Sequence, residues 1–346
     1  MMPSLPATCR LQPAKRSVWS GLRRWSLRCL FVLPLALPVP APAQVQTQVQ
    51  PEIQTSTEHS TPEIQNKQED TETQNATTDQ ETQSSPTVAT ARARAISLAP
   101  HITEILFAAG AQDSLIAVDS SSDYPPAAKD LPSIGDALRV NPERLLALKP
   151  DQVWAWQLNQ IGPELQGQLQ QASIRLIFAA PKTLDDIPAF IRLAGDRLDT
   201  AEAAVPAAAL LDQQIAALRQ NSRLGHTVSV FLEIGSEPLY TLARDPLIQD
   251  VLSTCKAQNI YARHAAVAPA ISLEDVLHKR PQVVILAYRD PAQLRARHLF
   301  WEKHLGLSPH ALLNLNPDAL YRPGPRLIEA TRQLCEQLDR YRAQAF

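Results

Sequence analysis

Beyond about residue 92, the apolar positions fall into short continuous runs that alternate with stretches of helical spacing. Short apolar runs are typical of buried strands, whereas apolar residues repeated every three or four positions are typical of helices. Their alternation predicts an α/β fold with parallel strands and helices on both faces. In the first half we expect strands at 95–99, 115–118, 152–156 and 174–178, and helices at 102–109, 141–149 and 161–171.

A long helical stretch separates these elements from a second set. Residues 200–221 are rich in Ala, Leu and Gln and predict one helix of roughly 33 Å. Pro206 would mark either the true start of this helix or a kink in it. The sequence thus predicts two doubly wound α/β lobes with parallel sheets, at 92–199 and 223–346, joined by a helix at 200–222. In the second lobe we expect elements at 227–233, 246–256, 273–279, 283–286, 311–315 and 325–342.

One segment occurs in both lobes. Residues 141–156 align without gaps on residues 272–287; each begins with a helix-capping residue, has Glu two positions on, and continues through an apolar helix, a basic residue, Pro and a β-run. The match indicates lobes related by a pseudo-two-fold axis. Glu143 and Glu274 have a structural explanation, because a helix dipole favours a carboxylate in the first turn. The functional alternative is a symmetric pair of exposed anionic side chains for a two-fold partner.

The first 91 residues differ from the rest in composition. Residues 1–43 have a basic start, an apolar run at 29–39 and small residues at 41–43, which predicts a cleavable export signal. The run is short for a bilayer span, and a retained membrane anchor is the alternative. Residues 44–91 consist mainly of Gln, Thr, Glu and Ser, which predicts a disordered tether.

Cysteine content and net charge narrow the possible classes of protein. Removal of the signal would leave Cys255 and Cys335, one pair in an oxidising compartment. We expect a disulfide between them, with two reduced core cysteines as the alternative. The formal net charge of −2 argues against a nucleic-acid partner. The sequence contains no closely spaced ligand set for zinc, no nucleophile elbow and no phosphate loop.

A resemblance to a known family rests on four motifs, which are Ile96-Ser-Leu-Ala-Pro100-His-Ile-Thr-Glu104, Ser122-Asp-Tyr-Pro-Pro126, Asn141-Pro-Glu-Arg144 with Leu148-Lys-Pro-Asp151, and Arg322-Pro-Gly-Pro-Arg326. The folded region resembles the periplasmic binding proteins for cobalamin, haem and ferric siderophores that serve ABC importers, and among them the cobalamin-binding members. The resemblance implies a rigid connecting helix, a ligand cleft between the lobes, a periplasmic location and no catalysis.

The resemblance also implies partners and structural residues. The ligand would be a cobalt corrinoid or an iron chelate, and no cofactor or resident metal is expected. Glu143 and Glu274 match docking glutamates that meet arginines on the importer's membrane subunits, and Cys255 and Cys335 match the family's disulfide. We expect a monomer.

The ligand site is matched in part. Trp156 corresponds to a cleft tryptophan at the carboxyl end of a strand, Tyr240 to an aromatic position on the other lobe, and Asp318 and Arg322 to polar contacts. Aromatic residues that the family has at three further positions are absent, and haem or a ferric siderophore is the alternative ligand. One of those positions is Ser121, and the other two lie near Ala137 and near Ala268.

Several of these residues have structural alternatives. Trp156 would otherwise fill the core, as we expect Trp154 to do two positions earlier. Tyr124, before two prolines, would either face the cleft or fix its loop. His101 would serve as an axial ligand for iron or cobalt, or else be a surface or helix-capping histidine.

The remaining candidates surround the last helix and the second sheet. Tyr240 and Tyr321 are further candidates for ligating haem iron. Arg322 and Arg326 flank Pro-Gly-Pro at the opening of the last helix, where they would hold carboxylate or amide oxygens or form a solvated turn.

Two other classes of function compete with ligand import. A chelatase-like enzyme would also have two α/β lobes, but it requires a general base and metal ligands in the cleft. A cell-surface scaffold is suggested by the long Gln/Thr-rich segment and would have an empty or collapsed cleft.

Overall fold

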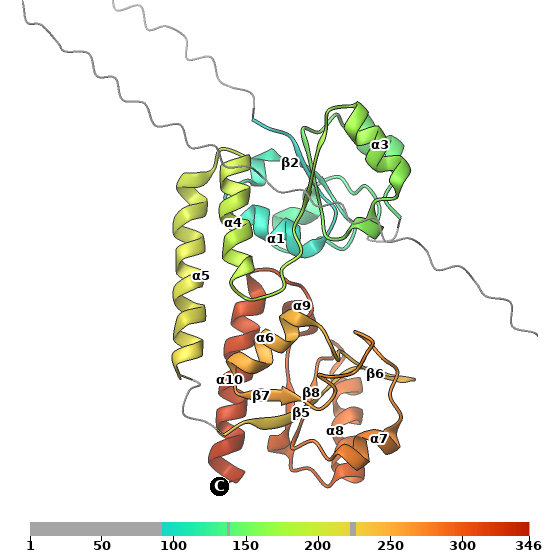
Figure 1. The fold of residues 1–346 in the computed structure, drawn as a ribbon, viewed down its shortest axis with the longest axis vertical. Coiled ribbons are helices and arrows are strands. Elements are labelled where there is room, and N and C mark those ends of the chain that lie inside the picture. Colours follow the sequence, from blue (N-terminus) through green and yellow to red (C-terminus); the bar gives the residue numbers. More distant parts are fainter. Residues whose placement is uncertain (1–91, 137–138, 222–225, 346) are drawn as a thin grey trace, which may run out of the picture. The chain divides into compact units, whose positions relative to one another are not determined.

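The computed structural model describes residues 92–136, 139–221 and 226–345, which form two β-sheets with helices around them (Figure 1). The predicted signal at 1–43, the predicted tether at 44–91 and Ala137 lie outside the described residues. We call the first sheet with its helices the N-terminal lobe and the second sheet with its helices the C-terminal lobe.

The sheet of the N-terminal lobe is parallel throughout and has the strand order β2-β1-β3-β4. Its strands and helices lie close to the predicted ranges, although helix α4 was missed. The elements are β1 (Ala95–Ser97), α1 (Pro100–Ala108), β2 (Leu115–Val118), α2 (Pro142–Ala147), β3 (Gln152–Ala155), α3 (Pro163–Gln171), β4 (Arg175–Phe178) and α4 (Asp186–Arg197), with short 3-10 turns at Gln112–Ser114, Pro126–Asp130 and Leu158–Gln160.

The sheet of the C-terminal lobe has the order β6-β5-β8-β9, with β7 paired to β5. The elements are β5 (Val228–Ser236), β6 (Leu239–Thr241), α6 (Pro246–Thr254), β7 (Ala257–Asn259), α7 (Leu273–Lys279), β8 (Val283–Leu286), α8 (Pro291–Leu305), a 3-10 turn (Pro309–Ala311), β9 (Leu312–Asn314), α9 (Pro317–Leu320) and α10 (Arg326–Ala345).

The sheets are parallel as predicted, except at one edge of the C-terminal lobe. Strand β6 runs antiparallel to β5 and pairs Gly235 with Tyr240 and Ser236 with Leu239. Only two residues separate these strands, and so short a connection can join antiparallel strands but cannot cross over to a parallel one.

The connecting helix α5 spans Ala201–Asn221 and lies alongside α4 and α10 (Figure 1). It begins five residues before Pro206, so this proline does not mark the helix start. Arg219 of α5 donates to Asp185, at the start of α4, at 2.7 and 2.9 Å, and lies 3.2 Å from Asp250 in α6. One guanidinium on α5 therefore contacts carboxylates of both lobes.

The largest hydrophobic cluster is shared between the lobes. It includes Ile102 and Leu106 of α1, Ile215 of α5, Leu252 of α6 and Leu334 of α10. Burial of apolar side chains contributes roughly 1.5–3 kcal/mol each. The lobes are consequently joined by a continuous core as well as by the chain, and both belong to one compact unit.

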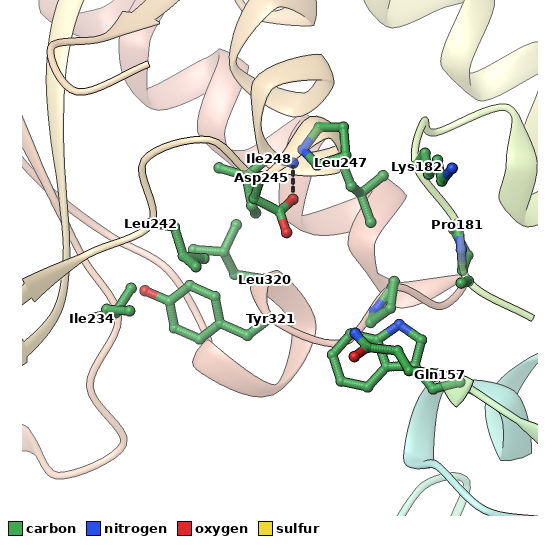
Figure 2. A pocket seen from close by; sticks show the side chains of 14 residues that line it. Gln157, Pro181, Lys182, Ile234, Leu242, Asp245, Leu247, Ile248, Leu320 and Tyr321 are labelled. Carbon is green, nitrogen blue, oxygen red and sulfur yellow. Dashed lines mark hydrogen bonds between the residues drawn. The ribbon is translucent and has the colours of Figure 1, made fainter. Parts of the chain in front are cut away.

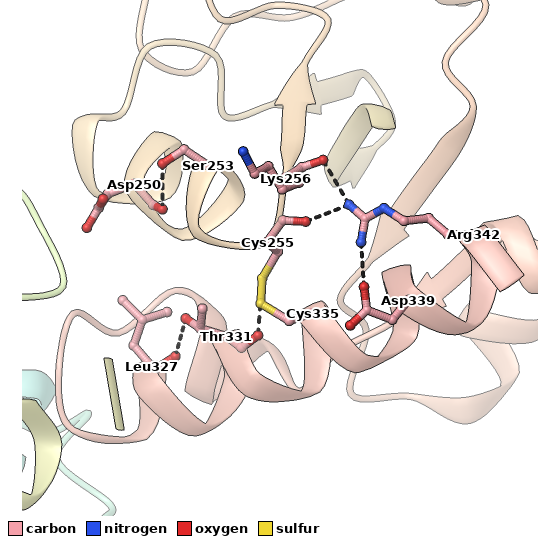
Figure 3. The surroundings of a disulfide bond; sticks show 9 residues. All are labelled: Asp250, Ser253, Cys255, Lys256, Leu327, Thr331, Cys335, Asp339 and Arg342. Atoms are coloured by element: carbon pink, nitrogen blue, oxygen red, sulfur yellow. Dashed lines mark hydrogen bonds and ion pairs between the residues drawn. A yellow bond between two sulfur atoms is a disulfide. The ribbon is translucent and has the colours of Figure 1, made fainter. Parts of the chain in front are cut away.

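The predicted disulfide joins Cys255, directly after α6, to Cys335 in α10 (Figure 3). Next to it, the guanidinium of Arg342 donates to the carbonyl oxygens of Cys255 and Lys256 at 2.7 and 2.9 Å and pairs with Asp339 at 2.6 Å. The last helix is thus joined to the segment between α6 and β7 by the disulfide and, two turns later, by the hydrogen bonds from Arg342.

Candidate functional site

Side chains from both lobes line a cavity of about 640 Å³ (Figure 2). This volume lies within the range of small-molecule sites. The cavity is mainly apolar, and its N-terminal-lobe wall follows the carboxyl ends of β3 and β4, where α/β proteins place their ligands. Its lining includes Trp156, Gln157, Pro181 and Lys182 from the N-terminal lobe and Ile234, Leu242, Asp245, Leu247, Ile248, Leu320, Tyr321 and Pro323 from the C-terminal lobe.

Trp156 is placed in this cavity by its position directly after β3. Its side chain is 38% exposed, whereas Trp154, two residues earlier on the strand, is fully buried as expected for the core. The backbone N–H of Trp156 donates to Oε1 of Gln160 at 3.0 Å. The tryptophan is therefore fixed through its main chain and presents its indole at the cavity wall.

His101 lies behind Trp156 and is not part of the cavity lining. The two rings meet edge to face with centroids 5.3 Å apart, and Nε2 of His101 lies 3.1 Å from the carbonyl oxygen of Ala179. Burial lowers the pKa of this histidine to about 4, so the neutral ring donates from Nε2 at neutral pH. The nitrogen left free to act as an axial ligand is Nδ1, and His101 does not line the cavity.

Tyr321 supplies the aromatic surface of the C-terminal lobe. Its ring lines the cavity, and its hydroxyl points toward Ile234 at the far wall, where it donates to the carbonyl oxygen of Glu233 at 3.4 Å (Figure 2). Burial, together with the nearby Tyr288 and Glu233, raises the pKa of Tyr321 well above its ordinary value. The side chain thus presents a protonated phenol ring to the cavity.

A buried carboxylate supports this wall. Glu233 is fully buried and accepts from Arg297 at 2.7 and 2.9 Å, from the indole N–H of Trp301 at 2.6 Å and from the hydroxyl of Tyr288. A buried charge persists only when it is paired and hydrogen-bonded, and this one is. This network was not predicted from the sequence; the available signal was a single acidic residue after the apolar run Val230–Leu232 of strand β5.

Asp318 and Arg322 lie beside the cavity and are engaged with each other. Arg322 lies 3.0 Å from Asp318 and pairs across the lobes with Asp123, while Arg289 donates to Asp318 at 2.8 Å. Hydrogen bonds from these arginines lower the pKa of both aspartates. Neither Asp318 nor Arg322 lines the cavity, although Tyr321 and Pro323 on either side of Arg322 do.

Tyr124 and Tyr240 are exposed aromatic residues outside the cavity lining. The guanidinium carbon of Arg326 lies 4.1 Å from the ring centroid of Tyr124, a cation–π contact between the lobes. Tyr240 lies on edge strand β6 and pairs with Gly235 and Ala270 through the backbone.

The repeated helices α2 and α7 have the predicted caps. Oδ1 of Asn141 accepts from the N–H of Arg144 at 2.9 Å, and Oγ of Ser272 accepts from the N–H of Asp275 at 3.1 Å. Glu143 and Glu274 lie in the first turns of these helices and are exposed.

A second cavity, of about 740 Å³, lies beside Glu143. It is polar, and its lining includes Asn159 and Gln160 from the turn that follows Trp156, and Glu164 at the start of α3. Gln160 thus contributes to this cavity while its side chain also holds the backbone of Trp156.

None of the helices at 92–136, 139–221 and 226–345 is both long and apolar enough to span a membrane. In the same ranges, no group of three or more His, Cys, Asp or Glu side chains is arranged to hold a metal ion.

Several known proteins are similar to this chain in sequence. The family model described as periplasmic binding protein matches residues 96–300. The chain is 38% identical over 247 residues to the vitamin B12-binding protein of Pectobacterium carotovorum subsp. carotovorum (strain PC1), covering 71% of this chain and 88% of that protein. It is 32% identical over 250 residues to the vitamin B12-binding protein of Vibrio campbellii, covering 72% and 90%.

Two solved structures show the same arrangement. The periplasmic vitamin B12 binding protein BtuF of Vibrio cholerae superposes with a TM-score of 0.66 at 33% identity, covering 72% of this chain and 97% of that chain. The periplasmic heme-binding protein RhuT from Roseiflexus sp. RS-1 superposes with a TM-score of 0.61 at 25% identity, covering 71% and 98%.

Proposed function

Since the chain belongs to the family of periplasmic binding proteins, we propose that it is the substrate-binding component of an ABC importer and carries a corrinoid, a cobalamin-like ligand. The corrin ring would lie against Trp156 of the N-terminal lobe and Tyr321 of the C-terminal lobe. The protein would act as a monomer, without catalysis, and deliver its ligand to the membrane subunits. The vitamin B12-binding relatives, of which the chain covers 88–90%, support this ligand class.

The choice of ligand rests on the absence of a histidine or tyrosine side chain directed at a metal among the described residues that line the cavity. A haem iron in such a site needs an axial ligand from the protein, commonly His or Tyr. His101 lies behind Trp156 and does not line the cavity, and the hydroxyl of Tyr321 is directed to the backbone carbonyl oxygen of Glu233. A cobalamin brings its own axial ligands and requires ring contacts instead. Tyr321 lines the cavity and supplies an aromatic surface for such a ring contact, which Ser121 and Ala268 cannot provide.

A ligand titration tests this proposal. The full-length protein is titrated with cyanocobalamin, cobinamide, haemin and a ferric hydroxamate siderophore, with tryptophan fluorescence and ligand absorbance as readouts. We expect the corrinoids to bind, and Trp156→Ala to weaken their binding roughly tenfold, because alanine offers the corrin ring neither the apolar area nor the aromatic face of the indole. Phe178→Ala is the matched control, because Phe178 is equally exposed, at 38%, at the end of the neighbouring strand and lies outside the cavity.

Each outcome of the titration has a defined meaning. Binding of haemin alone, with a shift of its absorbance bands, would establish the haem alternative in place of the corrinoid. Conversion of a porphyrin and a metal ion to a metalloporphyrin by the purified protein would contradict the non-catalytic role and favour a chelatase. If no ligand binds, the scaffold function remains.

Docking to the membrane subunits is the second part of the proposal. The exposed first-turn positions of Glu143 and Glu274, one on each lobe, support contacts with arginines of the two membrane subunits. Reversal of both charges, Glu143→Lys with Glu274→Lys, should abolish stimulation of the importer's ATPase and leave ligand affinity unchanged. Glu202→Lys, at an exposed first-turn glutamate of α5, should change neither quantity. Lost ligand affinity in the double variant would place these residues in the ligand site instead.

The route to the periplasm is the third part. Cleavage after residue 43 would remove the predicted export signal and leave the segment 44–91 as an N-terminal extension. Mass spectrometry of the protein from a periplasmic fraction should give the mass of residues 44–346. A full-length mass in the membrane fraction would identify a retained anchor.

A further inference from the structure

One ion pair between the lobes, with a buried carboxylate and a partly buried guanidinium, lies next to the ligand cavity. Glu104 of α1 is 3% exposed, and its carboxylate accepts two hydrogen bonds from Arg326 of α10, at 2.6 and 3.0 Å. Arg322 lies 4.0 Å from the same carboxylate. A two-pronged guanidinium–carboxylate pair is more directional than a single hydrogen bond, because both partners are planar.

The pair fixes the segment that forms one wall of the cavity. Arg326 follows residues 321–325, and Tyr321 and Pro323 of this segment line the cavity. Gly324, which also belongs to this segment, packs closely against α1. A Cβ atom added at Gly324 would lie 3.2 Å from a Glu104 carboxylate oxygen and 3.4 Å from the carbonyl oxygen of His101.

The opposite wall depends on the same helix α1. His101, one turn before Glu104, packs its ring against Trp156. On the outer side, Arg326 stacks over Tyr124, and Arg322 pairs with Asp123. The side chain of Glu104 therefore holds the C-terminal-lobe wall through Arg326, while its own helix supports the tryptophan of the N-terminal-lobe wall.

From this arrangement we infer that Glu104 and Arg326 are positioning residues that set the distance between Trp156 and Tyr321 and thereby the thickness of ligand the cavity accepts. Neither Glu104 nor Arg326 lines the cavity. The inference rests on the proposed function for the kind of ligand, but the fixed spacing of the walls is a property of the protein alone.

The inference predicts a change in selectivity, which a purely stabilising ion pair would not produce. In Glu104→Gln and in Arg326→Met, we expect the ratio of affinities for cobinamide and cyanocobalamin to change roughly three- to tenfold, which lies inside the roughly 2- to 30-fold range for residues that influence a site without contacting its ligand. The two corrinoids share a ring and differ in the bulk of the lower ligand. Because Glu104 and Arg326 act as a unit, the double variant should change the affinity ratio no more than the single variant with the larger change does.

Arg332→Met provides the matched control. Arg332 lies on the same helix and pairs with Glu329 and Glu336 on its exposed surface. Its loss should leave the affinity ratio unchanged. Arg326→Lys keeps the positive charge but cannot form the two parallel hydrogen bonds of a guanidinium. Its affinity ratio should therefore lie between those of the wild type and Arg326→Met.

Hydrogen exchange of the full-length protein without ligand gives a second, independent readout. In the Glu104 and Arg326 variants, amides of residues 320–328 and 156–160 should exchange faster together, while α7 and α8 keep their wild-type rates. Variants that are less stable but keep both the wild-type affinity ratio and the wild-type exchange in these segments would overturn the inference. If the wild-type protein binds no corrinoid, the proposed function fails, and the exchange experiment still decides whether the pair fixes the walls.

Discussion

The buried His101 gives the protein an acid sensitivity whose magnitude follows from its environment. Burial lowers its pKa from 6.5 to about 4 in the folded protein, whereas the unfolded chain keeps the ordinary value. Between these values the unfolded state binds more protons than the folded state, so the free energy of unfolding decreases as the pH falls through this window. At about 1.4 kcal/mol per unit, the shift corresponds to roughly 3 kcal/mol lost by pH 4 relative to pH 7.

A glutamine at this position isolates the contribution of the imidazole. In His101→Gln the amide can still donate to the carbonyl oxygen of Ala179, but it does not titrate. Urea unfolding at pH 7, 6, 5 and 4 should show the wild-type protein losing roughly 3 kcal/mol more than this variant, most of it between pH 6 and 4.

The test compares how steeply the free energy of unfolding changes with pH in the two proteins. A variant that is less stable by the same amount at every pH can therefore still be used. His310→Gln, at an exposed histidine, should follow the wild-type curve. If the curves of wild type and His101→Gln run parallel across this range, His101 is not held neutral by burial and the reasoning is refuted.

Three further changes test other parts of the structure. Replacing both Cys255 and Cys335 by Ser should lower the free energy of unfolding by about 4 kcal/mol in guanidinium titrations, because the bond closes a loop across 80 residues; a loss below 1 kcal/mol would contradict this. Arg297→Met should cost about 3–5 kcal/mol by leaving the buried Glu233 without its charge partner, and an unchanged thermal midpoint would argue otherwise. Asn141→Ala should cost about 1 kcal/mol through its lost cap, as chemical unfolding can check.

Elements with strong local signals were predicted closely from the sequence. The ranges expected for α7 and β8 coincide with those observed, Leu273–Lys279 and Val283–Leu286. Ser272 caps the helix, and Pro281 separates it from a β-run of uninterrupted apolar residues, so every signal lies within a few positions of the boundary.

Elements that depend on long-range packing were missed. Helix α8 has Trp301 as its one buried residue, so it lacks the apolar stripe by which a helix is recognised. The antiparallel strand β6 is only three residues long and forms the edge of a sheet that is otherwise parallel.

In the candidate site, too, residues with local signals could be predicted, whereas those placed by distant contacts could not. Trp156 could be separated from Trp154 because residues two apart share one face of a strand and the strand ends between them, which leaves Trp154 in the core and Trp156 at the edge. The role of Tyr321 could not be derived, since the direction of its hydroxyl is determined by Glu233, which lies 88 residues earlier in the chain. The pairing of Arg326 with Glu104 likewise joins residues 222 positions apart.

The side chain of Gln160 touches two places at once. It accepts from the N–H of Trp156 in the wall of one cavity, donates to the carbonyl oxygen of Leu98, and lines the other cavity beside Glu143. Thermodynamic linkage makes such an arrangement reciprocal. Any partner that moves Gln160 from the Glu143 side and changes the affinity for a molecule resting on Trp156 must have its own affinity changed by that molecule by the same factor.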